Sequence, residues 1–297
     1  MCAASSINRR HFIQVCAAVG LSAASAHAIS PQKEKGWQIG CFTRPWAEFN
    51  VETIFDAIAK AGFHYVGLMS AAPDSQLIIS VSTKEEKAVQ IGSEAKSRGL
   101  GILSNFAGDF GVEQSLQSGI EGLRRLIDLS VACGSKSLLL GGTDKPELFD
   151  AYYHAVANCC DEAMKKGIQL SLKPHGGLNS TGSQCRKIIE KVGHQNFRLW
   201  YDPGNIFYYS DGQLDPVQDA ESVDGIVTGM CVKDYQHPKD VEITPGTGKV
   251  NFVVVISRLK KGGFKSGPLL IECLKKGDLE SLQREAKVAR QSLESWL

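Results

Sequence analysis

The chain has 297 residues, and its 33 basic and 32 acidic side chains leave a formal net charge of only +1 at pH 7. This balance excludes the strongly basic field typical of nucleic-acid-binding proteins, and it gives no electrostatic reason to expect adhesion to a membrane surface. With 43% hydrophobic and 22% charged residues, the composition is that of a globular protein with a sizeable core.

The N-terminus has the pattern of an export signal. Arg9-Arg10 precedes Phe12 and an apolar, small-residue stretch over residues 15–24, and Ala26-His27-Ala28 has the small residues of a cleavage site. The stretch is shorter than the roughly 20 residues that a membrane-spanning helix needs. We therefore expect a twin-arginine-type signal over residues 1–28, cleavage near Ala28 and a periplasmic protein without a stable membrane anchor. A basic N-terminal tail is the alternative.

The nine cysteines do not form a recognisable metal or disulfide pattern. None has CxxC spacing, and seven of them follow the predicted signal, which is an odd number. Cys159 and Cys160 are adjacent within a predicted helix and are expected to be packed thiols. The spacing does not define any disulfide pairing.

After a short linker over residues 29–36, one rhythm runs through residues 37–297, which we interpret as a single domain. An apolar run of four to seven residues is followed by a polar turn, an amphipathic helix and a glycine. The eight candidate strands are WQIGCF, YVGLM, GILSNF, SLLLGG, IQLSLK, FRLWYD, IVTGMCVKD and GPLLIEC. They lack strict alternation, as expected of parallel strands covered on both sides. The pattern predicts an α/β fold, a single (β/α)8 TIM barrel; a doubly wound sheet is disfavoured because no GxGxxG follows the first strand.

The predicted helices have their own signals. Ser82-Thr83-Lys84-Glu85 is a capping-box pattern. Residues 112–133 and 147–166 show apolar spacing of three and four, and residues 278–297 predict a closing helix. In the helix over 112–133, one apolar stripe is expected to comprise Leu116, Ile120, Leu123, Leu126, Ile127 and Val131. Six glycines are expected to end helices in the left-handed conformation, at positions 62, 99, 134, 167, 193 and 263.

Polar side chains follow most of these strands at their C-terminal ends, where barrel enzymes place their active sites. Lys173 and His175 follow the fifth strand, and Asp202 and Asn205 follow the sixth. The others are Arg44 and Trp46 after the first strand, Asn105 after the third, Thr143 and Asp144 after the fourth, Cys231, Lys233 and Asp234 at the seventh, and Glu272 at the eighth. Ionisable groups are costly to place beside a core, so this ring predicts a functional site.

The order of these motifs resembles the xylose isomerase-like TIM barrels, the sugar phosphate isomerase and epimerase group that includes endonuclease IV. The motifs are the polar pair after strand five, Asp202-Pro203-Gly204-Asn205, Val232-Lys233-Asp234, Pro245-Gly246-Thr247-Gly248 and Ile271-Glu272, within a likeness over residues 37–297. The resemblance implies a divalent metal held by a Glu, an Asp, a His and a Glu on strands five to eight. Asp202 and Glu272 match this set, whereas Lys173 stands in place of the first Glu and Cys231 in place of the His.

Two hypotheses follow from this departure. In the first, Lys173 replaces the metal, because an ammonium group has no lone pair for a cation but can stabilise an oxyanion. In the second, a divalent Mn, Fe, Co or Zn ion is held by Asp202, Glu272, His175 and Cys231.

The resemblance implies a sugar isomerase or epimerase that transfers a proton alpha to the carbonyl of a ketose or keto-glycoside. Glu272 is then the principal base, Asp202 its partner carboxylate, Lys173 or a metal the oxyanion stabiliser, and His175 a positioning group. The residues expected to contact the sugar are Arg44, Trp46, Asn205, Lys233 and Asp234.

Other interpretations stay open. The same proton abstraction followed by loss of a beta substituent gives a lyase on oxidised glycosides, and a barrel without catalysis would only bind carbohydrate. Structural roles also compete: Cys231 as an inert thiol, His175 as a loop cap, Asp202 as a turn residue, and Lys233-Asp234 as an ion pair. We expect a small-molecule sugar as partner and no nucleic acid; the oligomeric state stays open.

Overall fold

The computed structural model describes residues 36–297. The predicted export signal over residues 1–28, and all of the predicted linker except residue 36, lie outside this range. None of the helices in residues 36–297 combines the length and apolar character that crossing a membrane requires.

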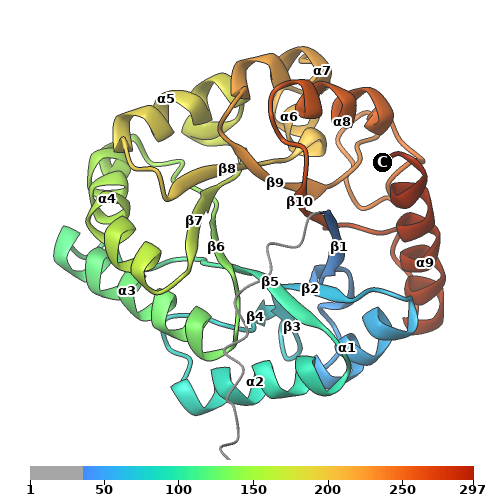
Figure 1. Cartoon of the computed structure of the whole chain (residues 1–297), viewed down its shortest axis with the longest axis horizontal. Coiled ribbons are helices and arrows are strands. Elements are labelled where there is room, and N and C mark those ends of the chain that lie inside the picture. The colour runs from blue at the N-terminus through green and yellow to red at the C-terminus, as the bar shows by residue number, and fades with distance from the viewer. Residues whose placement is uncertain (1–35) are drawn as a thin grey trace, which may run out of the picture. The chain divides into compact units, whose positions relative to one another are not determined.

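Eight parallel strands close into a barrel, which confirms the predicted (β/α)8 fold (Figure 1). Around the barrel they follow the order β1-β10-β9-β8-β7-β6-β5-β2, and β1 pairs with both β10 and β2 to close the ring. The strands are β1 (Trp37–Phe42), β2 (Tyr65–Leu68), β5 (Gly101–Phe106), β6 (Ser137–Leu140), β7 (Gln169–Leu172), β8 (Phe197–Tyr201), β9 (Val227–Val232) and β10 (Gly267–Ile271). Each lies within a predicted run.

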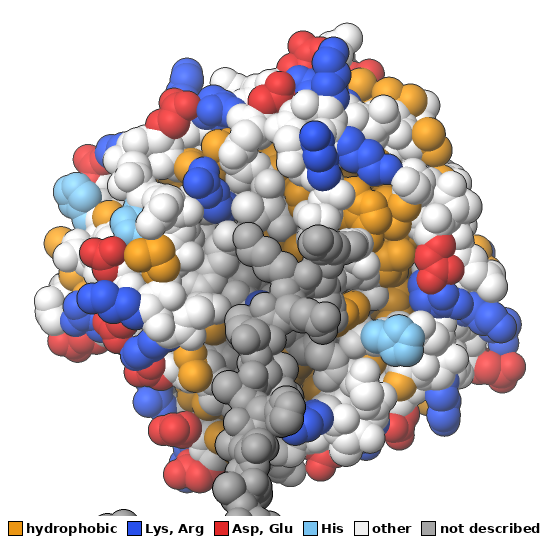
Figure 2. Space-filling view, viewed as in Figure 1, with side chains coloured by type: hydrophobic (Ala, Val, Ile, Leu, Met, Phe, Trp, Pro, Cys, Tyr) orange, Lys and Arg blue, Asp and Glu red, His pale blue; other side chains and the backbone are white. Residues whose placement is uncertain are grey.

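Helices surround the barrel and cover its outer face, and charged side chains gather around the rim of the face in Figure 2. The helices are α1 (Val51–Lys60), α2 (Glu85–Ser97), α3 (Leu116–Ala132), α4 (Phe149–Lys165), α5 (Gly182–Val192), α6 (Pro203–Tyr209), α7 (Pro216–Asp219), α8 (Phe252–Lys261) and α9 (Leu279–Ser295). Short 3-10 turns are η1 (Arg44–Trp46), η2 (Pro146–Leu148), η3 (Gly177–Asn179) and η4 (Ala220–Val223). A small hairpin of β3 (Ser70–Ala71) and β4 (Gln76–Leu77) was not predicted.

Of two local predictions about helices, one was wrong and the other holds in part. The capping box at Ser82 does not form, because α2 starts after Lys84, which makes no side-chain cap. A capping box forms at the start of α5 instead, where Thr181 and Gln184 satisfy each other's backbone N–H. In α3, the predicted stripe is buried only in its middle, since Leu116 and Val131 at its ends are exposed. The six glycines predicted at helix ends all have positive φ.

The barrel interior has its own layer of apolar side chains. Leu270 of β10 belongs to this inner cluster, whereas its neighbours Leu269 and Ile271 belong to the larger core beneath the helices. The members of the inner cluster are Phe42, Met69, Leu103, Leu139, Trp200, Cys231 and Leu270. Because alternate residues of a strand face opposite sides, the residue two positions after an inner one also faces inward. This rule directs Asp202, Lys233 and Glu272 toward the barrel axis, above the apolar layer.

Helix α6 packs closely against the end of β9. A Cβ atom on Gly204, in the first turn of α6, would lie 2.7 Å from the backbone oxygen of Lys233 and 2.8 Å from that of Asp234. The absence of a side chain at this position therefore sets how near Asp202, the N-cap of α6, can come to the residues after β9.

We expect Gly204→Ala to destabilise the fold by about 1–3 kcal/mol, because the added methyl group overlaps backbone atoms that cannot rotate away. Urea unfolding of the purified variant measures this loss. Gly36→Ala is the matched control, since a Cβ there meets no atom within 4 Å. Equal stability of both variants would contradict the assigned role of Gly204.

Candidate active site

Four charged side chains meet where β7, β8, β9 and β10 end, and we call Lys173, Asp202, Lys233 and Glu272 the charged tetrad. Each comes from a different strand end, where it is the residue directly after the last strand residue. All four are buried, with relative exposures of 0% for Lys173 and Asp202, 4% for Lys233 and 2% for Glu272. The barrel thus gathers two ammonium groups and two carboxylates in one place.

Each lysine of the tetrad contacts both carboxylates. Lys173 Nζ lies 2.6 Å from Glu272 Oε2 and 3.0 Å from Asp202 Oδ2. Lys233 Nζ lies 2.6 Å from Glu272 Oε1 and 3.3 Å from the same Asp202 Oδ2. Asp202 Oδ2 makes both of its contacts as ion pairs without a hydrogen bond. The charges of the tetrad sum to zero, which offsets much of the cost of removing them from water.

The tetrad favours the charged form of its members. Burial alone would raise the pKa of Glu272, but the ammonium groups of Lys173 and Lys233 hold that pKa well below its usual range. Burial likewise opposes the charged form of Lys173, and its acidic surroundings outweigh burial and raise its pKa. We assign this rise to Asp202 and Glu272, because burial raises the pKa of neighbouring Cys231 and keeps it a neutral thiol.

An apolar floor lies beneath the tetrad. Trp200 precedes Asp202 by two residues and is buried in the barrel interior, with its ring 6.4 Å from that of Phe42. Its pairing partner on the adjacent strand β9 is Gly229, where a Cβ atom would lie 2.4 Å from the indole. Glycine at this position therefore leaves the space for the tryptophan. A floor of low polarity strengthens the ion pairs above it, since few dipoles compete with the charges.

Asn205 connects three elements of the site. Its backbone N–H donates to Asp202 Oδ1 (2.9 Å), its side-chain amide donates to the carbonyl of Pro174 (2.7 Å), and its Oδ1 accepts from Lys233 Nζ (3.0 Å). The side chain of Asn179 donates to the carbonyl of Lys173, and this bond also holds the end of β7. These contacts give Asn205 a positioning role in the site.

His175 lies at the mouth beside a cavity of about 390 Å³. The surface of His175 is exposed to solvent, but its ring lies in a densely packed region. This burial and the positive charges of Lys173 and Lys233 lower the pKa of the imidazole to about 4, so the ring is neutral at pH 7. The cavity lining comprises Gly141, Gly142, Thr143, Asp144, His175, Gly176, Gly177, Asn179 and Tyr209. Its size suits a small ligand.

Arg44 lies at the opposite sector of the mouth, after β1. Its guanidinium donates to Glu242 and to the thiol of Cys273. Arg44 and Glu242 line a second cavity of about 380 Å³ together with Ser70 and Lys276. Its predicted contact with a sugar stays a prediction, and its ion pair with Glu242 was not foreseen, because Glu242 lies in a loop without a motif.

Two residues predicted to contact the sugar are completely buried in the structure. Trp46 is completely buried in the core. Asp234 is also completely buried, and its carboxylate accepts hydrogen bonds from the backbone N–H groups of Tyr235, Gly246, Gly248 and Val250. Asp234 therefore fixes the loop that follows β9. A salt bridge between Asp234 and Lys233, the structural alternative, is absent in the part of the chain that the structure describes, where Lys233 pairs with the tetrad carboxylates.

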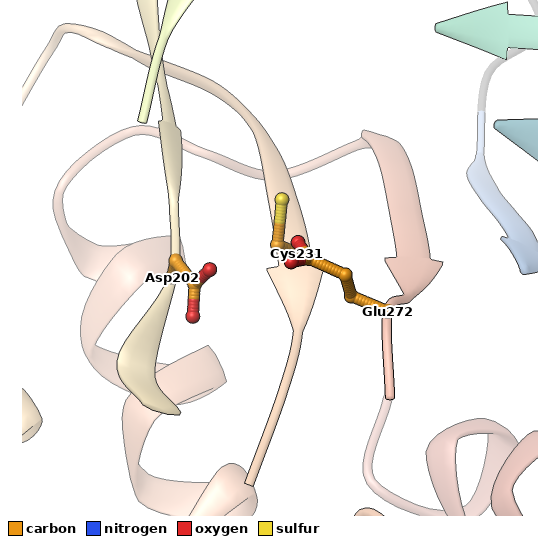
Figure 3. Close-up of side chains that lie close together, drawn as sticks. All are labelled: Asp202, Cys231 and Glu272. Carbon is orange, nitrogen blue, oxygen red and sulfur yellow. The ribbon is translucent and has the colours of Figure 1, made fainter. Parts of the chain in front are cut away.

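Asp202, Cys231 and Glu272 are close enough to hold a metal ion: their donor atoms lie within 4.8 Å of one another (Figure 3). His175 is not part of this donor group among residues 36–297. With Lys173 charged, however, the set does not fit an ion well. The ammonium nitrogen already contacts an oxygen of each carboxylate, and a divalent ion would add two positive charges to a buried, neutral group.

Comparison with known proteins identifies a family and several solved structures that share this fold. The sequence profile of the xylose isomerase-like TIM barrels matches residues 55–297. A xylose isomerase domain protein from Planctomyces limnophilus has 17% identity and a TM-score of 0.67, over 88% of this chain and 97% of that one. A D-psicose 3-epimerase from Clostridium cellulolyticum H10 has 14% identity and a TM-score of 0.67, over 88% and 99%. A 3-keto-D-glucoside 4-epimerase from E. coli has 14% identity and a TM-score of 0.64, over 86% and 99%. At these identities the likeness establishes the fold, and no curated protein sequence matches the chain.

The depressed pKa of Glu272 predicts a loss of stability in acid. Its ionised form is favoured in the folded state, so its contribution is complete above the ordinary pKa of 4.5 and is lost as pH falls through the lower folded value. We expect wild type to exceed Glu272→Gln in unfolding free energy at pH 7, and the difference to shrink below about pH 4.

Chemical denaturation at a series of pH values from 7 to 3 measures this difference. Glu190→Gln, on the exposed face of α5, is the matched control and should track wild type throughout. A difference between wild type and Glu272→Gln that does not change with pH would contradict the assigned role of the lysines.

Proposed function

The chain belongs to the xylose isomerase-like TIM barrel family, and from this premise we propose that it is a sugar isomerase or epimerase. Its substrate is a ketose or a keto-glycoside, and its reaction is proton transfer at the carbon next to the carbonyl. The main support for this proposal is the pair of buried carboxylates, Asp202 and Glu272, which lie beside two ammonium groups at the barrel mouth. The names of two fold neighbours, a D-psicose 3-epimerase and a 3-keto-D-glucoside 4-epimerase, support this substrate class.

The tetrad contains both groups that this reaction needs. A carboxylate oxygen of Glu272 takes the proton from the carbon, and the electron pair of the broken C–H bond moves onto the carbonyl oxygen. The ammonium of Lys173 donates to that oxygen and stabilises the negative charge of the resulting enediolate. Return of a proton to the other face of the same carbon gives the epimer, and return to the neighbouring carbon gives the isomer.

The resting contacts of Glu272 imply an exchange of hydrogen bonds on substrate binding. Both of its oxygens contact lysines, which makes the carboxylate a weak base. A carbonyl oxygen that accepts from Lys173 takes over one of these contacts, which raises the basicity of Glu272 when substrate is present. Asp202 is then the partner carboxylate, which relays a solvent proton to the opposite face of the carbon, and Asn205 keeps it in place through its backbone N–H.

Solvent isotope exchange tests this proposal. We expect the wild-type protein, incubated in D2O with a panel of ketoses and 3-keto-glycosides, to introduce deuterium next to the carbonyl of at least one sugar. Glu272→Gln should lower that rate by about 100-fold to 10,000-fold, the usual contribution of a general base. Glu190→Gln serves again as control, and NMR detects the exchange. Absence of deuterium in every sugar with the wild-type protein would refute the proposal.

Product analysis in the same samples distinguishes the lyase. Loss of a beta substituent releases an alcohol and leaves an unsaturated sugar, whereas epimerisation and isomerisation conserve the mass of the substrate apart from deuterium.

A carbohydrate-binding barrel without catalysis is the second candidate, because the resting Glu272 is so weak a base. Calorimetry of the Asp202→Asn, Glu272→Gln double variant separates it from the first. Sugar binding that persists in this variant, together with no exchange by wild type, would support binding alone.

We also propose that the protein acts after export, on the basis of Arg9-Arg10 and Ala26-His27-Ala28. In a bacterial host with a twin-arginine system, we expect the mature protein in the periplasm to begin close to Ile29. Replacing Arg9 and Arg10 by lysine should keep the full-length chain in the cytoplasm. N-terminal sequencing of fractionated cells measures both outcomes, and a periplasmic chain that retains Met1 would refute signal cleavage.

A further inference from the structure

The three metal-donor residues and the two lysines compete for the same space. Asp202, Cys231 and Glu272 come from the ends of β8, β9 and β10, and their donor atoms lie within 4.8 Å of one another. An ion bridging the two carboxylates has to lie between them. That position is bounded by the ammonium of Lys173, whose nitrogen is 2.6 Å from Glu272 and 3.0 Å from Asp202.

Charge excludes sharing of this position. Two carboxylates and two ammonium groups give a neutral buried tetrad, and a divalent ion would raise its charge to about +2. The thiol of Cys231 could supply one negative charge by releasing its proton to solvent, and that still leaves an excess positive charge. Lys233 cannot take over the role of Lys173 alone, because its ammonium also donates to Asn205 and pairs with the other oxygen of Glu272.

We propose that Lys173 is a built-in substitute for a divalent cation. The native protein therefore binds no divalent ion at this centre, and removal of the Lys173 ammonium uncovers a latent site formed by Asp202, Cys231 and Glu272. The ligand set of two carboxylates and one thiolate suits zinc or cobalt. With an uncharged residue at position 173, the ion, the thiolate, both carboxylates and Lys233 sum to zero charge. This inference concerns cation binding alone and holds whether or not the barrel turns over a sugar.

Cobalt titration without substrate tests the proposal. Cys231 loses its proton when it binds the ion, so a thiolate-to-cobalt charge-transfer band reports on this residue and on no carboxylate. We expect Lys173→Met to show the band and to bind cobalt about 100-fold or more tighter than wild type, because one repelling charge in a buried site is gone. Lys191→Met, on the exposed surface of α5, is the matched control and should behave as wild type.

Two further variants define the ligands and guard against misfolding. Adding Cys231→Ser to Lys173→Met should abolish the charge-transfer band. Lys173→Glu supplies a third carboxylate, and so a fourth ligand residue, at the end of β7 and should bind cobalt with the same band. Circular dichroism establishes which variants are folded, and a folded Lys173 variant that binds cobalt no better than wild type would overturn the proposal.

The wild-type protein decides the question even if no variant folds. After incubation with excess zinc and gel filtration, elemental analysis should find far less than one zinc per chain at pH 7. One equivalent of zinc that is lost on Cys231→Ser substitution would overturn the proposal. These readouts do not depend on turnover, so failure to find a sugar substrate would leave them intact.

Discussion

The mutual neutralisation of two lysines and two carboxylates inside the barrel mouth is the interaction on which the rest of the site depends. Buried charges are stable only when geometry and partners compensate their lost hydration. Here the compensation requires four strands, since β7, β8, β9 and β10 each supply one member of the charged tetrad. Neutrality is thus a property of the assembled barrel and of no local segment. Asn205 and Gly204 extend this dependence to α6, which carries Asp202 at its start.

The same interaction limits the chemistry of the site. An ion pair that holds Glu272 in its charged form also makes it a poor base, so stability of the resting site and readiness for proton transfer oppose each other. A site of this kind needs its ligand to redistribute hydrogen bonds. Neutral His175 stands at the edge of the tetrad next to a cavity, where it can accept or donate a hydrogen bond without adding charge.

The sequence determined much of the fold because its strand signals are local. Runs of branched and aromatic residues located all eight barrel strands, and glycines marked helix ends, since both depend on neighbours along the chain. The strand-end rule also gathered Lys173, Asp202, Lys233 and Glu272 at one face. What the sequence did not predict are pairings between distant residues. The double contact of Lys233 with both carboxylates, and the partnership of Arg44 with Glu242, depend on barrel register and loop paths that no motif encodes. The capping box failed for a local reason, because Ser80 and Thr83 form a turn that delays α2.

The loop after β9 shows how such a site can be held while its surroundings vary. Asp234 collects backbone N–H groups from across the loop, and a backbone donor is the same for almost every amino acid. Two of these donors are restricted: a Cβ on Gly248 would lie 2.5 Å from Asp234 Oδ1, and Gly246 has a positive φ of 97° that favours glycine. The loop can therefore exchange its outward side chains over evolution and so alter what the mouth recognises, while the adjoining Lys233 keeps its position.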